Sequence, residues 1–477
     1  MTRITRIATR ITNTKTNNPA KGDLKWSPDK KERAVLMKKA LQSLKTVNLR
    51  LFASLLVLGL CPTIYTTLRV FFIGQLPGEW SYSIAGQLSW VNLLYEVLSE
   101  AIILPLYYFI GQVLTDKKEF TNRVKTGLLV SFGFYSVLSV VIMIFAPGLL
   151  RFMAADPSII DASAQYIRIE SIGNVCGLLF SFMLVALVTL GKDKYVYILT
   201  GAKLVLCVLL DTFMTSTLPF SLNLGINGIA YTNIIVNLLL FAVTVALLAK
   251  EEIKVFSREP ISFAWMRDFL KIGGISGAES LVRNVAYMLM VSRMVNMVGE
   301  QGTYWVANNF IWGWLLLPIL QLGELIKREV GTDREAVRKN TLGYFFITFA
   351  TCVLWCATIP VWKPFMAHVL GYSDVDKLFT LVMVLLGFYV LFAVQNVFDA
   401  TFYGLGKTNY MLFESIVTNS LFYGGAFILY ITGFWTPTLI GIALLFGIGN
   451  AFDSIVSLLA YIFLLKKEKI NVLSTEE

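Results

Sequence analysis

Several ionisable residues of this chain lie inside long apolar stretches, where a charged side chain is costly unless it has a partner or a role. Glu96 and Glu100 are four positions apart, so a helix would place both on one face. Two neighbouring carboxylates in an apolar environment do not both ionise readily, so at least one should bind a proton, a cation or a basic group. We therefore predict that Glu96 and Glu100, together with the isolated acid Asp399, bind an ion.

Two arginines inside apolar stretches could balance these acids. Arg69 is expected to pair with a carboxylate of a neighbouring helix, and Glu96 or Glu100 would be the simplest partner, so that Arg69 would set their charge. Arg283 follows Glu279 by four positions, in the order that favours an ion pair on a helix. The Glu279–Arg283 pair could line a cavity, or it could be a structural pair that neutralises itself.

The remaining reactive residues form no arrangement typical of an enzyme or a metal site. His368 is the only histidine, and the five cysteines lie in apolar stretches at spacings that match no zinc motif. Asp453 is isolated, while Lys203 and Asp211 lie about two helical turns apart, too far for a direct pair. We expect no catalytic residue and no metal ligand, which argues against an intramembrane enzyme acting on lipid. A transport-dead receptor or scaffold is a separate alternative.

The composition requires a membrane to position these residues. The chain is 56% hydrophobic and 15% charged, and each crossing of a bilayer takes about 20 apolar residues. We predict an all-α membrane protein with twelve transmembrane helices, several of them long enough to tilt or to project beyond the bilayer. The expected spans are residues 51–74, 84–113, 127–148, 165–190, 196–217, 226–249, 270–297, 304–327, 341–364, 377–405, 410–433 and 437–465.

The second half of the chain repeats features of the first. The segment Leu190–Tyr195 (LGKDKY) recurs later in the chain as Leu405–Tyr410 (LGKTNY). The pair Thr115-Asp116 also recurs, as Thr332-Asp333, at nearly the same distance along the chain. An even number of spans per repeat gives both halves the same orientation in the membrane. The repeat therefore predicts two six-helix lobes related by a pseudo-two-fold axis along the membrane normal, a parallel repeat found in transporters.

The distribution of Lys and Arg among the short loops predicts the orientation of the chain. The even-numbered loops and the C-terminal tail hold nearly all of the basic loop residues, so both termini are expected to be cytoplasmic. The net charge of +10 reflects mainly this bias and implies no nucleic-acid partner. The basic N-terminal tail is either disordered or an interfacial segment that binds anionic lipid. The predicted divisions are a tail at 1–44, an N-lobe at 45–250, an inter-lobe linker at 251–269, a C-lobe at 270–465 and a tail at 466–477.

Four motifs in order resemble those of the multidrug and toxic compound extrusion (MATE) transporters. Residues 147–157 (PGLLRFMAADP), with the following Tyr166–Ile169 (YIRI), resemble the family's "LLxxLGADPxV…AxxYLRI" stretch. The Leu-Gly-Lys turns match the family's turns after helices 4 and 10. Residues 224–230 (LGINGIA) and 272–280 (IGGISGAES) match its entries into helices 6 and 7. The resemblance covers about residues 45–465.

The resemblance implies two lobes around a cavity that opens alternately to each side, with export of mostly cationic or amphipathic compounds against Na⁺ or H⁺. Three positions depart from the family pattern. Arg69 stands before Gly74 where many members have an acid or amide in helix 1, and Arg283 stands where some have a carboxylate. The helix-10 acid of those members falls near Val394–Asn396 and not on Asp399. Either other acids of this chain replace the usual ones, or the coupling differs.

These observations together predict a monomeric MATE-type antiporter in the plasma (inner) membrane. It would exchange a small-molecule substrate for Na⁺ or H⁺ and need no other cofactor. The alternative is an exporter of an anionic or zwitterionic metabolite, or a flippase of a lipid-linked precursor from the same superfamily, because two arginines lie within the spans. The predicted coupling residues are Glu96, Glu100 and Asp399, and the predicted cavity residues are Arg69, Glu279, Arg283, Gln395 and Asn396.

Overall fold

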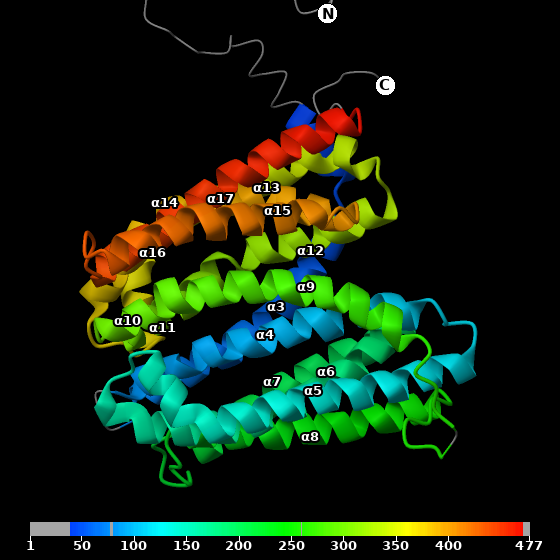
Figure 1. The fold of residues 1–477 in the computed structure, drawn as a ribbon, viewed down its shortest axis with the longest axis horizontal. Helices are drawn as coiled ribbons and strands as arrows, with labels where there is room; N and C mark the ends of the chain where they lie inside the picture. The colour runs from blue at the N-terminus through cyan, green and yellow to red at the C-terminus, as the bar shows by residue number, and fades with distance from the viewer. Residues whose placement is uncertain (1–38, 77–79, 259, 471–477) are drawn as a thin grey trace, which may run out of the picture.

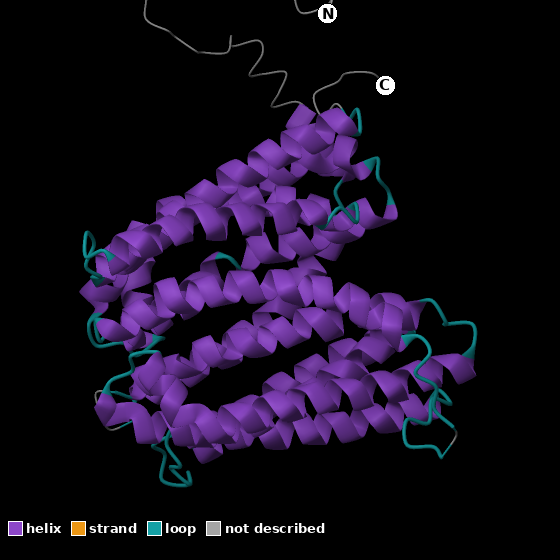
Figure 2. Ribbon diagram, viewed as in Figure 1, coloured by secondary structure: helices purple, strands orange, loops and turns teal. Residues whose placement is uncertain are grey.

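The computed structural model describes residues 39–76, 80–258 and 260–470, and this part of the chain is helical and contains no strand (Figures 1 and 2). The all-α prediction is therefore confirmed, whereas most of the predicted N-terminal tail lies outside the described residues. The first half contains α3 (Leu49–Gly74), α4 (Ser81–Gly111), α5 (Lys117–Phe152), α6 (Ile160–Thr189), α7 (Asp193–Met214) and α8 (Asn227–Lys250). The second half contains α9 (Met266–Tyr287), η2 (Met288–Ser292), α10 (Arg293–Met297), α11 (Gln301–Phe310), η3 (Ile311–Leu315), α12 (Leu317–Thr332), α13 (Ala336–His368), α14 (Val375–Gly404), α15 (Asn409–Val417), η4 (Thr418–Tyr423), α16 (Gly424–Ile431) and α17 (Leu439–Lys467).

Ten of the described helices are long and apolar enough to cross a membrane. The pair Gln301–Leu315 and Leu317–Thr332, bent by 52°, makes an eleventh span if it is counted as one. The helix α9, which overlaps the stretch predicted at 270–297, is not among them, and it carries Glu279 and Arg283. The predicted number of twelve is therefore not confirmed, because charged residues make this helix more polar than the ten long apolar ones.

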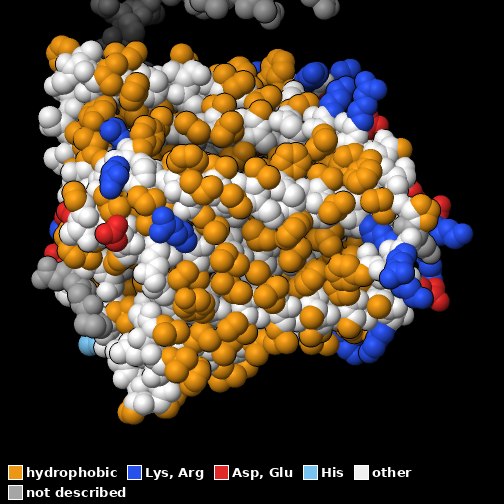
Figure 3. Space-filling model, turned by 60° about the horizontal axis from the view of Figure 1, so that its bottom comes forward, with side chains coloured by type: hydrophobic (Ala, Val, Ile, Leu, Met, Phe, Trp, Pro, Cys, Tyr) orange, Lys and Arg blue, Asp and Glu red, His pale blue; other side chains and the backbone are white. Residues whose placement is uncertain are grey.

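The surface agrees with a membrane-spanning bundle. Figure 3 shows a broad band of hydrophobic side chains across the middle of one face, with charged side chains toward its edges. Large exposed side chains such as Ile144, Phe349 and Leu459, each more than half exposed, belong to helices that are otherwise well packed. An apolar exterior of this kind is stable in lipid and not in water.

The repeated sequence motifs adopt matching turns. Gly191 and Gly406 have φ angles of +69° and +67°, and each follows the last turn of a long helix. The next backbone N–H donates back into that turn, from Lys192 to the Leu187 carbonyl (3.0 Å) and from Lys407 to the Phe402 carbonyl (2.8 Å). This left-handed ending favours a residue without a Cβ, which is the physical reason for the repeated glycine.

The turn after α5 contains the segment that resembles the "LGADP" pattern. Ala154 has a φ of +55°, the left-handed region that glycine adopts without strain, at the position where the family pattern has glycine. Asp156 accepts hydrogen bonds from the Ser158 N–H (2.8 Å) and hydroxyl (2.6 Å), and these bonds lower the pKa of its exposed carboxyl group.

The buried apolar side chains form two main cores. One lies among the helices of residues 90–269 and includes Trp90 and Phe182, and the other lies among residues 290–446, with Val70 of α3, and includes Tyr389. The start of α9 packs with the first core through Phe269. A Cβ on Gly273 would lie 1.9 Å from the Ala101 carbonyl oxygen, so α9 rests directly on α4.

The first half of α3 packs against the second half of the chain. Leu55 shares a core cluster with Leu322 and Leu325 of α12. Just before α3, the Ser43 hydroxyl donates to the Lys339 carbonyl at 2.6 Å. The later part of α3 contacts the first half of the chain through Arg69. Consequently α3 contacts both halves of the chain, and α9 joins the first core at Phe269 and packs against the second through Tyr287.

The two ends of the bundle are held together differently. At the end away from the described termini, hydrogen bonds join the two halves: Tyr82 donates to Gly371 (3.1 Å), and the Gln301 amide donates to the Gly86 carbonyl (2.8 Å). At the other end, the loop ion pairs within the described residues stay within one half, as for Lys192–Glu251 (2.7 Å), and the halves meet through the segment before α3, as in the Ser43–Lys339 bond. Figure 1 shows the ribbons of the two halves farther apart on that side.

Candidate functional site

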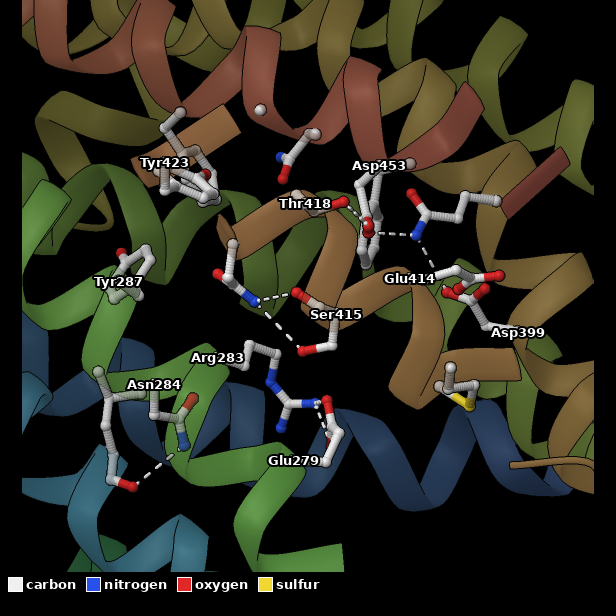
Figure 4. A pocket seen from close by; sticks show the side chains of 18 of the residues that line it. Glu279, Arg283, Asn284, Tyr287, Asp399, Glu414, Ser415, Thr418, Tyr423 and Asp453 are labelled. Carbon is white, nitrogen blue, oxygen red and sulfur yellow. Dashed lines mark hydrogen bonds and ion pairs between the residues drawn. The ribbon is translucent and has the colours of Figure 1, made fainter. Parts of the chain in front are cut away.

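A cavity of about 560 Å³ lies between α4, α9, α11, η3, α14, α15, η4 and α17. Its volume falls within the range of about 300–1,000 Å³ typical of small-molecule sites. One part of the wall is aromatic, formed by Tyr287, Trp312, Phe392, Tyr423 and Phe446. The rest is polar and contains most of the ionisable residues that the structure places near the centre of the bundle (Figure 4).

Three acids from different helices line one side of the cavity: Asp399 of α14, Glu414 of α15 and Asp453 of α17. The Gln395 side-chain amide donates to both aspartates, to Asp453 Oδ2 at 2.6 Å and to Asp399 Oδ2 at 3.2 Å. The Thr418 hydroxyl donates to the other oxygen of Asp453 at 2.7 Å. These bonds hold the acids in place without neutralising them.

Glu414 completes this acid cluster, which we define as Asp399, Glu414 and Asp453. Figure 4 shows its carboxyl group beside that of Asp399, with which it interacts electrostatically. Glu414 is only 3% exposed, and its Oε1 has no hydrogen-bond partner in the described structure. None of the ion pairs found in residues 39–76, 80–258 and 260–470 includes a member of the cluster. Glu414 is buried and the two aspartates are partly buried. Three such carboxyl groups without a basic partner can be accommodated by protons or by a bound cation.

Arg283 forms a second charged group with three other acids. It lies 3.1 Å from Glu279 on its own helix, and 2.7 Å from Glu100 and 3.4 Å from Glu96 on α4. Glu96 and Glu100 do lie on one face of α4, and their basic partner is Arg283. One guanidinium shared by three carboxylates leaves excess negative charge where α4 meets α9.

Arg69 lies elsewhere, and its predicted pairing with Glu96 or Glu100 is wrong. Its Nε donates to Asp211 Oδ2 at 2.7 Å, and its Nη2 donates to the Asn233 amide oxygen at 2.7 Å. Asn233 in turn donates to Glu170 at 2.6 Å. The sequence showed only that Lys203, on the same helix, is too far away to be the direct partner of Asp211. The neighbouring α3 supplies one, and this buried pair neutralises itself outside the cavity.

The cavity contains most, but not all, of the residues predicted for it. Glu96, Glu279, Arg283, Gln395 and Asp399 line its wall. Arg69 and Asn396 do not, and neither does the predicted coupling residue Glu100. The Asn396 amide instead donates to the Ile319 carbonyl of α12 at 2.8 Å. Glu414 was missed by the sequence analysis, although it lies in the apolar stretch predicted at 410–433 and the rule applied to Glu96 would have found it.

The fold and the charged cavity define a multi-pass helical membrane protein with a small-molecule-sized site between its helices. The MatE family model matches residues 56–213 of the chain. The whole described bundle has the fold of solved MATE transporters, so the resemblance predicted from the motifs is confirmed. Proteins of that family are transporters and not enzymes.

Three solved structures illustrate the likeness. An inward-facing multidrug resistance MATE family transporter of the MOP superfamily is 19% identical, with a TM-score of 0.70 over 85% of this chain and 95% of the other. An outward-facing structure of such a transporter is 19% identical, with a TM-score of 0.68 over 91% and 99%. A MOP superfamily transporter from Pyrococcus furiosus, described as having a binding pocket of reverse polarity that suggests a different function, is 18% identical, with a TM-score of 0.66 over 91% and 99%. At these identities the likeness concerns the fold. No curated protein matches the sequence.

Proposed function

We propose that this protein is a secondary active exporter of the MATE type. It moves cationic or amphipathic small molecules out of the cell in exchange for Na⁺ or H⁺. The observation that carries this proposal is the acid cluster of Asp399, Glu414 and Asp453, which lines a cavity with an aromatic wall and has no ion-pair partner in the described structure. Aromatic faces and unpaired carboxylates are the groups that bind an organic cation.

Exchange follows from competition for the same carboxylates. A proton or Na⁺ bound to the acid cluster relieves the repulsion between its members, and a cationic substrate relieves it equally well. Because binding of the coupling ion and binding of the substrate exclude each other, the substrate is released on the side of the membrane where the coupling ion is abundant. Asp399 keeps the coupling role predicted from the sequence and shares it with Glu414 and Asp453. Glu96 and Glu100 are already bound to Arg283, and we propose that they hold α4 and α9 together.

Alternating access is supported by the difference between the two ends of the bundle. If the termini are cytoplasmic, as the loop charges predict, the hydrogen-bonded end is the outer one and the structure is inward-facing. Moving the two halves would open the outer contacts and close the inner side. Three π-helical segments, η2, η3 and η4, lie in the second half beside the cavity, and such interruptions are frequent at functional sites.

We also propose the finer organisation predicted from the sequence. The matching turns at Gly191 and Gly406 support two lobes that arose as a parallel repeat. The apolar surface supports a location in a membrane, which we propose is the plasma membrane, and the proposal needs only one copy of the chain.

The second candidate is export of an anionic or zwitterionic molecule, and Arg283 is the observation that favours it. Its guanidinium lines the cavity and is 37% exposed, so a carboxylate or phosphate could reach it. The three acids around it favour a cation instead, because an incoming anion would meet them first. Transport of an anionic dye that is lost in Arg283→Gln would support the second candidate.

The experiment that tests the proposal is efflux of ethidium from proteoliposomes under Na⁺ and H⁺ gradients imposed separately. Movement driven by one gradient, and not by an unrelated ion, supports export and identifies the coupling ion. Folded protein that moves no cation under either gradient would contradict the proposal.

A further inference from the structure

A second cavity, of about 370 Å³, lies beside the acidic one between α3, α4, α11 and η3. It differs from the first in that no charged side chain lines it. Its wall contains hydroxyl groups, side-chain amides and indole rings, among them those of Thr66, Ser89, Trp305, Asn308, Asn309 and Trp312. It therefore suits a neutral ligand that forms hydrogen bonds.

Several polar groups of this second cavity are not used by the protein itself. The Asn309 amide donates to the Trp305 carbonyl at 2.8 Å and the Asn308 amide donates weakly to Tyr287 at 3.4 Å, but neither amide oxygen accepts a bond within the described structure. The Thr66 hydroxyl likewise makes no hydrogen bond to a described residue. By contrast, Thr63 and Thr67 on the same helix are bonded to the protein. The free groups can both donate and accept, which is what the hydroxyls of a ligand require.

The two cavities share part of their walls. Ser89, Asn308 and Trp312 line both of them. One molecule could therefore place a positive group near the acid cluster and a second, neutral group beside Thr66 and Asn309. The helix formed by α11 and η3 is bent by 52° from α12, and this bend lies next to the shared wall. Transporter sites are commonly built at interrupted helices of this kind.

We propose that the transported molecule is bipartite, an organic amine that carries a neutral group rich in hydroxyls or amides, such as a sugar or another polyol. This inference rests on the proposed export function and adds the class of substrate. A charged group in the second cavity would lack a counter-charge, and a purely apolar group would leave the amide oxygens of Asn308 and Asn309 unbonded. A polyol satisfies them and can lie against the indole faces.

The test uses two amines that differ only in their hydroxyl groups. N-benzyl-D-glucamine carries a six-carbon polyol, and N-benzylhexylamine carries an alkyl chain of the same length. Binding of each to the full chain in nanodiscs is measured by calorimetry, for the unaltered protein and for Thr66→Val, Asn309→Leu and Asp453→Asn. Thr432→Val, an exposed change at the outer end of α16, is the control for the loss of a hydroxyl. Thermal melting of each variant shows that it is folded.

We expect Thr66→Val and Asn309→Leu each to weaken binding of the glucamine by about fivefold, the effect of one lost hydrogen bond, and to leave the hexylamine within about twofold. Excess D-glucitol should compete with the glucamine and not with the hexylamine, which tests the idea without any substitution. Equal effects on both amines, or no binding of the glucamine by the unaltered protein, would overturn the proposal.

The role of the acids is tested separately by Asp453→Asn. This change should weaken both amines if the acid cluster binds the cation. If it weakens neither while Thr66→Val still discriminates between them, the proposed function fails and the second cavity stands. If it weakens both and Thr66→Val does not discriminate, the second cavity fails and the export function stands.

Discussion

Replacing Asp453 by asparagine tests the acid cluster with little change in shape. Asp453 accepts bonds of 2.6 Å from Gln395 and 2.7 Å from Thr418. Asparagine keeps an oxygen for the Gln395 amide, and its own amide can donate to the Thr418 hydroxyl, which is able to accept as well as donate. Both contacts can therefore survive, and we expect a melting temperature close to that of the unaltered protein.

What Asp453→Asn removes is a negative charge that forms no ion pair in the described structure. A hydrogen bond to a charged group contributes about 1.5–3 kcal/mol, so losing the charge should weaken a bound organic cation by roughly 10- to 150-fold. The electrostatic attraction itself is larger at short range, about 4 kcal/mol between unit charges 4 Å apart at an effective dielectric constant of 20, but desolvation of the cation offsets part of it.

The assay is equilibrium binding of ethidium followed by gradient-driven efflux from proteoliposomes. The matched control is Asp376→Asn, because Asp376 is an exposed acid at the start of α14 that pairs with Lys363 far from the cavity. The control should bind and transport normally. Unchanged affinity and unchanged gradient dependence in Asp453→Asn would refute the role given to the acid cluster.

Three further predictions concern how the helices are held. Gly273→Ala places a methyl group 1.9 Å from a carbonyl oxygen of α4 and should destabilise the protein by about 1–3 kcal/mol. Gly274→Ala meets nothing within 4 Å and should not lower the melting temperature. Equal melting temperatures of the two variants would contradict this packing. Arg69→Gln leaves Asp211 buried without its partner and should lower the free energy of unfolding by about 3–5 kcal/mol. Adding Asp211→Asn to the same chain should restore most of this stability. If it does not, the loss of the ion pair is not the cause of the destabilisation. Arg283→Gln should lower the melting temperature at neutral pH by leaving three acids unpaired, and an unchanged value would show that these ion pairs contribute little.

The sequence was sufficient to predict that the helices span a membrane and to identify many residues of the site. Apolar runs of bilayer length predicted the helices, since a backbone in lipid must satisfy its own hydrogen bonds. The cost of burying charge identified Asp399, Glu279 and Arg283, all of which line the cavity. The repeated glycine turns also adopt matching conformations.

What the sequence could not supply was which helices are neighbours. Arg69 was assigned to Glu96 or Glu100 because they were the nearest unpaired acids along the chain, yet α3 lies beside α7 and meets Asp211. Asn396 was assigned to the cavity with Gln395, but consecutive residues on a helix point about 100° apart, and only Gln395 lines the wall. Both errors depend on helix rotation and packing, which hydrophobicity alone does not determine.

The central claim is that a coupling ion and a cationic substrate compete for Asp399, Glu414 and Asp453. The most direct measurement is the release of protons, followed with a pH dye in weak buffer, or of ²²Na⁺, when tetraphenylphosphonium is added to the purified protein. The account predicts that binding of this cation releases one of the two ions in proportion to the sites filled, and that Asp453→Asn reduces the release. Binding of the cation at full occupancy with neither ion released would contradict it.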